Sequence, residues 1–237
     1  MIAGQGVVFL HGRGIVFLHG AGARREVWQL QALAFPQAET PDLPGRDGRS
    51  PPQTVADHVT ALRPVLEAAR VLVGHSLGGA IALHYALAAP ARLAGLVLLG
   101  TGARLDPAQV WLRRLDTGED ALADLAPQSF APGAAERLTR KSLAMLRSLD
   151  PAVVRADFAA AAGFDVRDRL GGVLVPVLII SGTEDRLVPP RYAEFLHAHL
   201  PRATLAWIEG AGHMAMLEQP QAVNGAIRNF LQQVTER

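Results

Sequence analysis

The chain has 237 residues, 49% hydrophobic and 19% charged, and this composition excludes a mainly disordered protein. Lys and Arg total 23 against 22 Asp and Glu, with no basic or acidic block, so nucleic acid and anionic membrane surfaces are not expected partners. The absence of cysteine excludes disulfides, Cys-ligated metals and a thiol nucleophile.

No apolar run reaches the roughly 18 residues of a membrane span, and the start of the chain has no basic segment followed by a cleavage site. We therefore expect no membrane span and a cytoplasmic location.

Over the first hundred residues, short β-branched segments alternate with helical patterns, which is typical of βαβ units and a parallel sheet. We expect strands at 14–18, 38–43, 70–74 and 95–100, and helices near 25–34, 54–68 and 77–89. The second of these helices opens with Thr54 and has Asp57 three residues on, which is close to a capping box.

Residues 102–172 contain no convincing strand, and the pattern predicts a series of helices. The Asp-Pro pairs at 106–107 and 150–151 each predict an N-cap before a first-turn proline. Strands resume at 176–182 and 204–210, followed by helices near 190–199 and 219–235. We therefore expect a core of residues 1–101 and 173–237, with residues 102–172 inserted as a helical cap.

A near-exact repeat stands before the first helix: VVFLHGRG (7–14) is followed at once by IVFLHGAG (15–22). Because eight is even, either copy could occupy the same place in a sheet. The second copy is the better candidate because it continues directly into a helical pattern. The first could be an extra edge strand, an arm that pairs with a second subunit to make a homodimer, or a scar of duplication or cloning.

Residues 74–78, GHSLG, fit the pattern G-x-S-x-G between a predicted strand and a predicted helix. Small residues around the serine suit a sharp strand-to-helix turn. Such a turn would expose Ser76 Oγ above the sheet and place the N–H of Leu77 at a helix N-terminus, where it can stabilise an oxyanion. The alternative is a helix start with an ordinary N-cap serine.

A serine nucleophile needs a base, and the base needs an orienting acid. His213 follows the last predicted strand in a glycine-rich loop, and Asp185 follows the strand before it. With Ser76, all three lie at the carboxyl ends of parallel strands, where open α/β sheets place their sites. Glu184, beside Asp185, is the nearest rival acid. No pair of histidines has a convincing metal spacing, so we predict no metal.

These motifs resemble the α/β-hydrolases of the esterase, lipase and C–C hydrolase group. In family order they are HGAG (19–22), DLPGRDGRS (42–50), GHSLGG (74–79), GTEDRLVP (182–189) and GAGHM (210–214). The resemblance implies Ser76 as nucleophile, His213 as general base and then acid, and Asp185 as its orienting acid. It also implies an oxyanion hole from the N–H groups of Ala21 and Leu77, and no cofactor.

The resemblance further implies a mostly parallel α/β-hydrolase sheet flanked by helices, with the cap inserted after the family's sixth strand. Only some 13 residues precede the strand at 14, so the N-terminal edge of the sheet should be shortened or irregular. Arg46-Asp47 replaces a single position of the family loop, and we expect this to alter only a surface turn.

By the same resemblance, the cap should supply much of the substrate pocket. The expected pocket residues are Trp111, Phe130, Met145 and, beside the histidine, Met214, which together imply an apolar site for an acyl or alkyl chain. Residues 102–172 hold nine Arg and one Lys against ten acids. They are therefore neutral overall and indicate no anionic substrate, although single arginines could bind a carboxylate.

The interpretation is a cofactor-free serine hydrolase, a carboxylesterase that cleaves short to medium acyl esters through an acyl-enzyme. Its expected partner is a small-molecule ester. The alternatives are a C–C bond or lactone hydrolase on the same scaffold, or a hydrolase-fold protein that binds a ligand.

Overall fold

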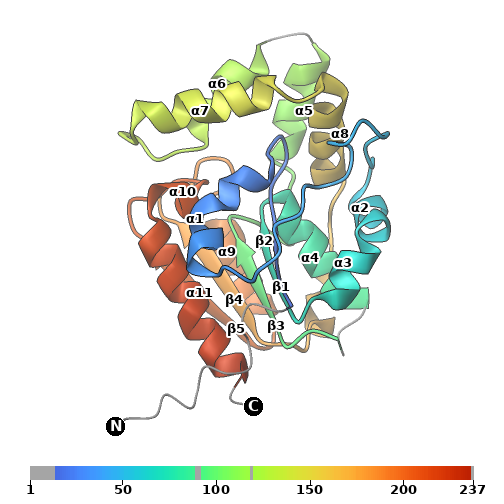
Figure 1. The fold of residues 1–237 in the computed structure, drawn as a ribbon, viewed down its shortest axis with the longest axis vertical. Helices are drawn as coiled ribbons and strands as arrows, with labels where there is room; N and C mark the ends of the chain where they lie inside the picture. The colour runs from blue at the N-terminus through green and yellow to red at the C-terminus, as the bar shows by residue number, and fades with distance from the viewer. Residues whose placement is uncertain (1–13, 89–91, 118–119, 236–237) are drawn as a thin grey trace.

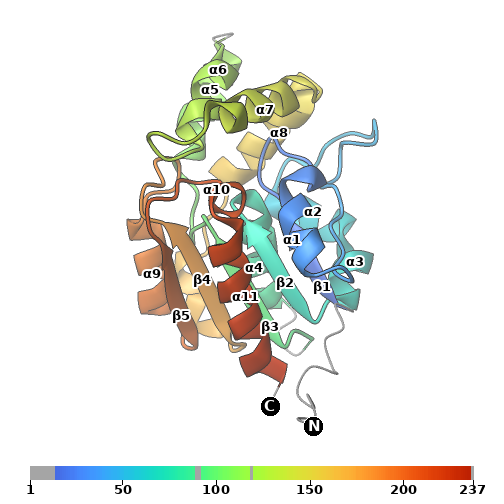
Figure 2. The ribbon, with the colours of Figure 1, turned by 60° about the vertical axis from the view of Figure 1, so that its left-hand side comes forward.

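The computed structural model describes residues 14–88, 92–117 and 120–235. These residues form a five-stranded parallel sheet in the order β1-β2-β3-β4-β5. Its strands are β1 (Ile15–Leu18), β2 (Val71–His75), β3 (Gly95–Leu99), β4 (Val177–Gly182) and β5 (Ala203–Ile208). The predicted parallel α/β architecture is confirmed, with helices on both faces of the sheet (Figures 1 and 2).

Side chains of the strands alternate between two buried clusters, as the period of two requires. Val16 and Leu72 pack on the face covered by α2, α3, α4 and α9, whereas Phe17 and Val73 pack on the face covered by η1, α1, α10 and α11. The bounds are α2 (Val55–Ala61), α3 (Arg63–Ala68), α4 (Leu77–Ala88), α9 (Arg191–His199), η1 (Arg25–Trp28), α1 (Gln29–Ala34), α10 (Ala215–Glu218) and α11 (Pro220–Thr235).

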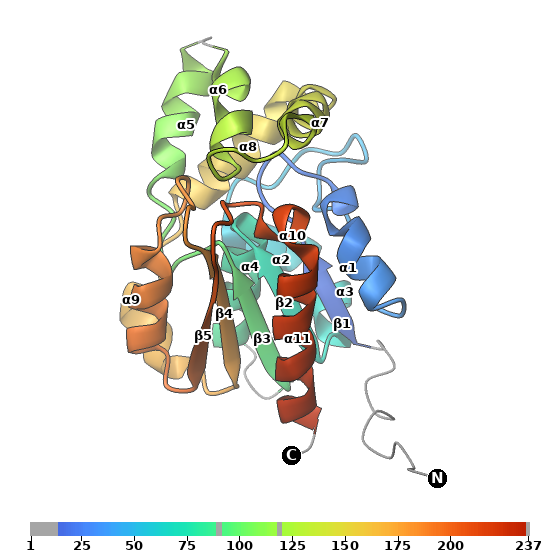
Figure 3. The ribbon, with the colours of Figure 1, turned by 90° about the vertical axis from the view of Figure 1, so that its left-hand side faces the viewer.

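Between β3 and β4 the chain forms α5 (Ala108–Asp116), α6 (Ala121–Gln128), α7 (Glu136–Arg147), α8 (Pro151–Ala162) and η2 (Arg167–Gly172). Helices α5–α8, here called the helical cap, lie beyond the carboxyl ends of the strands (Figures 1 and 3). Trp111, Leu125, Leu146 and Phe158 belong to a separate hydrophobic cluster within the cap. The division of the chain into two domains stays a prediction.

The predicted strand at 38–43 is wrong. Only Glu39 pairs with the sheet: its N–H donates to the Ile15 carbonyl, and its carbonyl accepts from the Phe17 N–H, both at 2.9 Å. Pro41 and Pro44 lack the N–H groups that a longer ladder would need, so the segment leaves the sheet after one bridge. Within the part of the chain that the structure describes, this edge of the sheet is therefore short and irregular.

The predicted helix at 54–68 is divided into α2 and α3 at Leu62. Pro64 lies in the first turn of α3, where its missing N–H is tolerated, but it cannot continue the hydrogen bonding of α2. The predicted capping box is present: Thr54 Oγ1 accepts from the Asp57 N–H, and the Asp57 carboxylate accepts from the Thr54 N–H, both at 3.1 Å.

Of the two predicted Asp-Pro caps, only Asp150 is one, accepting from the Ala152 N–H at 2.8 Å. Asp106 instead accepts from the Tyr192 hydroxyl at 2.8 Å, and α5 begins at Ala108. The Asp106 carboxylate thus binds the side chain of Tyr192, which is distant in the sequence, instead of capping α5.

The second copy of the repeat forms β1 and the loop after it. The first copy, apart from Gly14, lies outside the described residues, as does any dimer formed through it.

Candidate active site

Ser76 stands at a sharp turn between β2 and α4. Its φ of +52° is the only positive value of a non-glycine residue among those described. A Cβ on Gly74 would lie 2.3 Å from the Gly78 carbonyl oxygen, and one on Gly78 would lie 2.2 Å from the Leu18 carbonyl oxygen. The G-x-S-x-G spacing therefore has a steric cause, because side chains at both glycines would collide with backbone.

Asp185 follows β4 and His213 follows β5. His213 Nδ1 donates to Asp185 Oδ2 at 2.8 Å. Asp185 Oδ1 accepts from the N–H groups of Leu187 at 2.9 Å and Val188 at 2.8 Å, and the side chain is buried. The carboxylate is thus held on both oxygens and fixes the tautomer of His213, so that Nε2 is the nitrogen able to accept a proton.

The loop after β1 passes close to Ser76. A Cβ on Gly20 would lie 3.1 Å from the Ser76 Cβ, and the neighbouring Ala21 lines the same pocket. Leu77 begins α4, and its side chain is buried. Within the described residues, neither the Ala21 nor the Leu77 backbone N–H donates to a protein acceptor. Both donors therefore remain available to an oxyanion.

Two buried histidines, His19 and His75, support these loops. His75 Nε2 donates to the His213 carbonyl at 3.1 Å, and burial together with the nearby His213 holds the pKa of His75 well below its usual value. His19 Nδ1 donates to the Gly20 carbonyl at 3.0 Å while its Nε2 accepts from the Leu43 N–H at 2.9 Å.

Glu218 is a residue that the sequence analysis missed. Its carboxylate accepts from the N–H of Gly212, beside the histidine, and from the N–H of Ala131, each at 2.9 Å. Burial raises the pKa of Glu218. Glu218 thus ties the histidine loop to the chain that leads out of α6. No spacing pattern marks such a residue, because Ala131 is 87 positions away.

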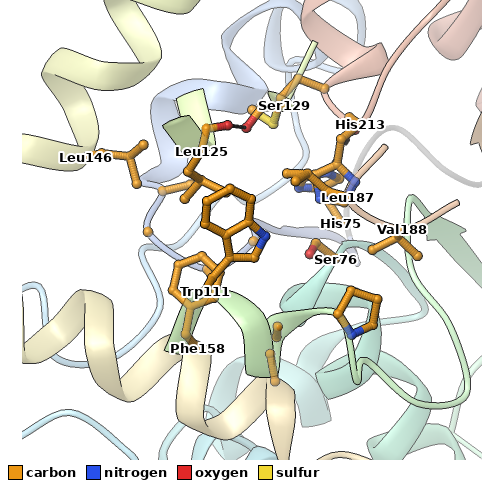
Figure 4. Close-up of a pocket in the computed structure, with 18 of the residues that line it drawn as sticks. His75, Ser76, Trp111, Leu125, Ser129, Leu146, Phe158, Leu187, Val188 and His213 are labelled. Atoms are coloured by element: carbon orange, nitrogen blue, oxygen red, sulfur yellow. Dashed lines mark hydrogen bonds between the residues drawn. The ribbon is translucent and has the colours of Figure 1, made fainter. Parts of the chain in front are cut away.

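A pocket of about 70 Å³ lies between these loops and the helical cap, and no Asp, Glu, Lys or Arg lines it (Figure 4). Ser76 and His213 share its wall with Ala21 and with cap side chains. The lining includes Trp111, Leu125, Ser129, Ser142, Met145, Leu146, Phe158, Leu187, Val188 and Met214.

Three of the four expected pocket residues, Trp111, Met145 and Met214, line this cavity. Phe130 is not among the lining residues. Its side chain is fully buried in the core beneath the cap, and its carbonyl accepts from Arg186 Nη2 at 3.0 Å.

The expectation that Arg46 alters only a surface turn is wrong. Its side chain is 2% exposed and forms a bidentate ion pair with Asp157 of α8. Nη2 donates to Oδ2 at 2.5 Å, and Nη1 donates to Oδ1 at 3.2 Å. Asp157, which is fully buried, also accepts from the Gly22 N–H at 2.9 Å. The additional residue of the loop thus places a guanidinium between the cap and the loop that carries Ala21.

His58 lies against this ion pair, with Nε2 3.9 Å from Asp157 Oδ1, and neither of its ring nitrogens has a hydrogen-bond partner. Burial lowers the pKa of His58 from 6.5 to about 4; the negative charge of Asp157 acts in the opposite direction, while Arg46 and His19 lower the pKa further.

Stability should therefore fall as the pH drops from about 6.5 to about 4, because the unfolded chain then binds a proton that buried His58 does not. The expected loss is roughly 3 kcal/mol, measured by urea denaturation across this range. In His58→Leu the slope should be smaller but not zero, because buried His75 acts with the same sign. A wild-type stability that does not change over this range would contradict the prediction.

In the described ranges, no three His, Asp or Glu side chains gather as metal ligands. No helix there has the length and apolar character needed to cross a membrane.

A serine at a strained turn and a histidine bonded to a buried aspartate, both at the carboxyl edge of a parallel sheet, are features of a hydrolase on an α/β scaffold. The Alpha/beta hydrolase family profile matches residues 15–226, and the chain belongs to that family.

The pimeloyl-(acyl-carrier protein) methyl ester esterase of Aromatoleum aromaticum is 34% identical, over 84% of this chain and 90% of the relative. A protein described as a carbamate hydrolase, RutD of Caulobacter sp. (strain K31), is 32% identical, over 79% and 76% respectively. A solved thermophilic esterase superposes with a TM-score of 0.77 at 32% identity, covering 94% of this chain and 90% of that one. Family and relatives together support a hydrolase of the esterase kind.

Proposed function

We propose that this protein is a cofactor-free serine carboxylesterase that cleaves short to medium acyl esters of small molecules. The observation that carries the proposal is that His213, whose Nδ1 is hydrogen-bonded to buried Asp185, lines one apolar pocket together with Ser76. The expected cytoplasmic location belongs to the same proposal.

In the proposed mechanism, Ser76 Oγ attacks the ester carbonyl while His213 Nε2 takes its proton. Asp185 stabilises the resulting imidazolium, and the N–H groups of Ala21 and Leu77 stabilise the oxyanion of the tetrahedral intermediate. That intermediate collapses, the alcohol leaves with the proton from His213, and the acyl group stays on Ser76. Water then attacks the acyl-enzyme with His213 again as base, which releases the acid and restores the serine.

The size of the pocket supports a short acyl group. A volume of about 70 Å³ corresponds to roughly five water-sized positions, at about 10–15 Å³ for each. Acetyl and butyryl groups fit this space, whereas a dodecanoyl chain would have to displace cap side chains such as Trp111 and Phe158.

For para-nitrophenyl esters, kcat/KM should therefore rise about tenfold from acetate to butyrate, since each buried methylene contributes about 0.8 kcal/mol. From butyrate to dodecanoate it should fall about tenfold or more. Steady-state kinetics over acetate, butyrate, octanoate and dodecanoate measure this profile. Equal kcat/KM for butyrate and dodecanoate would contradict the short-acyl proposal.

Leu187→Ala is the matched variant, because this half-buried side chain lines the pocket. Its removal should move the optimum toward octanoate. Leu33→Ala, at a position that is 80% exposed on α1, is the control and should leave the profile unchanged.

Carbamates, lactones and C–C substrates also react at a carbonyl, so a Ser, His and Asp set serves them equally. Product analysis with a carbamate, a lactone and a diketone beside the esters distinguishes these activities. Ligand binding without turnover of any of them would favour the hydrolase-fold binding protein.

A further inference from the structure

A second and larger cavity, of about 480 Å³, lies between α7 and the segment η1–α1. Figure 1 shows α7 crossing beyond α1 at the carboxyl side of the sheet. We call this cavity the basic groove. It is lined by Arg24, Glu26, Val27, Gln29, Leu30, Arg137, Leu138, Lys141, Ser142, Met145, Ser148 and Leu217.

Three cations, Arg24, Arg137 and Lys141, face the groove against a single acid, Glu26. Among the described residues, no carboxylate lies within 4 Å of the charged group of any of the three. Arg24 is nevertheless close enough to Asp42 for its charge to help lower the pKa of that carboxyl. Other cap arginines do have carboxylate partners: Arg140 pairs with Glu136, Arg147 with Asp120, and Arg155 with Asp116. The positive charge at the groove is therefore not neutralised locally, and Lys141 is the one lysine of the sequence.

The groove adjoins the pocket of Ser76. Ser142 and Met145, one turn apart on α7, line both cavities. The pocket contains no Asp, Glu, Lys or Arg, whereas the groove has an excess of positive charge. A ligand that extends past these two residues would occupy both cavities. Its reacting end would then contact the apolar pocket, and its far end would lie near the cations of the groove.

We propose that the basic groove binds an anionic group, a carboxylate or a phosphate, on the alcohol part of the ester. The proposal rests on the proposed function, in which the small pocket takes the acyl group and leaves the alcohol to extend past Met145. Overall, residues 102–172 are neutral. Folding nevertheless brings Arg137 and Lys141 of the cap to the same groove as Arg24 of the core. The groove therefore has a local excess of positive charge, which the neutral composition of residues 102–172 does not indicate.

Matched substrates test this inference: the butyrate ester of ω-hydroxyhexanoic acid and that of its neutral amide. The wild type should prefer the carboxylate about tenfold in kcat/KM, through lower KM, since two or three exposed charges each contribute modestly. The preference should shrink as the salt concentration is raised. A third substrate with a terminal phosphate in place of the carboxylate identifies which anion the groove favours.

The groove variant is Arg137→Gln with Lys141→Gln, and the matched control is Arg140→Gln with Arg147→Gln. Both doubles remove two charges from exposed positions of α7, but the control residues line neither cavity. The groove variant should lose the preference for the anionic esters while its kcat/KM for the neutral ester stays unchanged. The control should keep both.

Equal kcat/KM of the wild type for the anionic and neutral esters, or an equal loss of preference in the control variant, overturns the inference and leaves the esterase proposal standing. Hydrolysis of none of the esters overturns the esterase proposal, and the inference with it.

Discussion

Replacing Ser76 by alanine should lower kcat/KM for para-nitrophenyl butyrate by about 10⁴-fold or more, because no other group replaces the attacking oxygen. Ser129→Ala is the matched control: this serine lines the same pocket, but its hydroxyl already donates to the Leu125 carbonyl. We expect at most a few-fold change there. Activity of Ser76→Ala within tenfold of wild type would refute the serine mechanism and favour the ligand-binding alternative.

Asp185→Asn tests the same site without removing its scaffold. The remaining side-chain oxygen can still accept from the N–H groups of Leu187 and Val188, so the loop should keep its shape. The amide NH₂ that faces His213 Nδ1 can no longer accept its proton, and the imidazole takes the wrong tautomer. We expect a loss in kcat on the order of 10⁴-fold with an unchanged midpoint of thermal unfolding.

Asp157→Ala should lower the free energy of unfolding by about 3–5 kcal/mol, because it leaves the buried guanidinium of Arg46 without a counter-ion. Urea denaturation measures this loss. Asp47→Ala is the control, because Asp47 follows Arg46 in the same loop but is exposed, and its ion-pair partner among the described residues is the exposed Arg49. That control should change stability by less than about 1 kcal/mol.

Removing both charges distinguishes an unpaired charge from simple loss of packing. In Arg46→Met with Asp157→Leu, apolar side chains replace the pair, and most of the stability lost in Asp157→Ala should return. If the double variant is no more stable than Asp157→Ala, the ion pair is not the cause. The Gly22 N–H would still lack its acceptor in the double variant, so full recovery is not expected.

Much of the fold was predictable because its determinants are local. The alternation of apolar residues in β1, β2 and β3 reflects the two buried faces of a parallel sheet. Gly74 and Gly78 mark a turn whose steric cause lies within a few positions and one neighbouring strand. Even the division of the helix at Pro64 and the end of the ladder at Pro41 have causes visible in the sequence, since proline lacks an N–H.

The candidate site divides in the same way. By itself, the sequence determined which side chains follow the strand ends, but it left Glu184 as a rival to Asp185. The tertiary structure shows that Asp185 is the carboxylate hydrogen-bonded to His213. Local pattern could not reveal the partners of Arg46, Glu218 and Asp106, because each depends on a contact with a residue far away in the chain.

Charge and volume were decided only by the tertiary structure. Composition indicated a neutral cap, yet the fold places α7 across a groove from η1 and α1 and gathers Arg24, Arg137 and Lys141 around it. The neighbouring pocket has a volume of about 70 Å³, which is set by how side chains from several helices pack around it. The charge around a groove and the volume of a pocket depend on distances between segments that are far apart in the sequence. Hydrophobic periodicity and local motifs do not specify these distances, because they depend on residues that are close together along the chain.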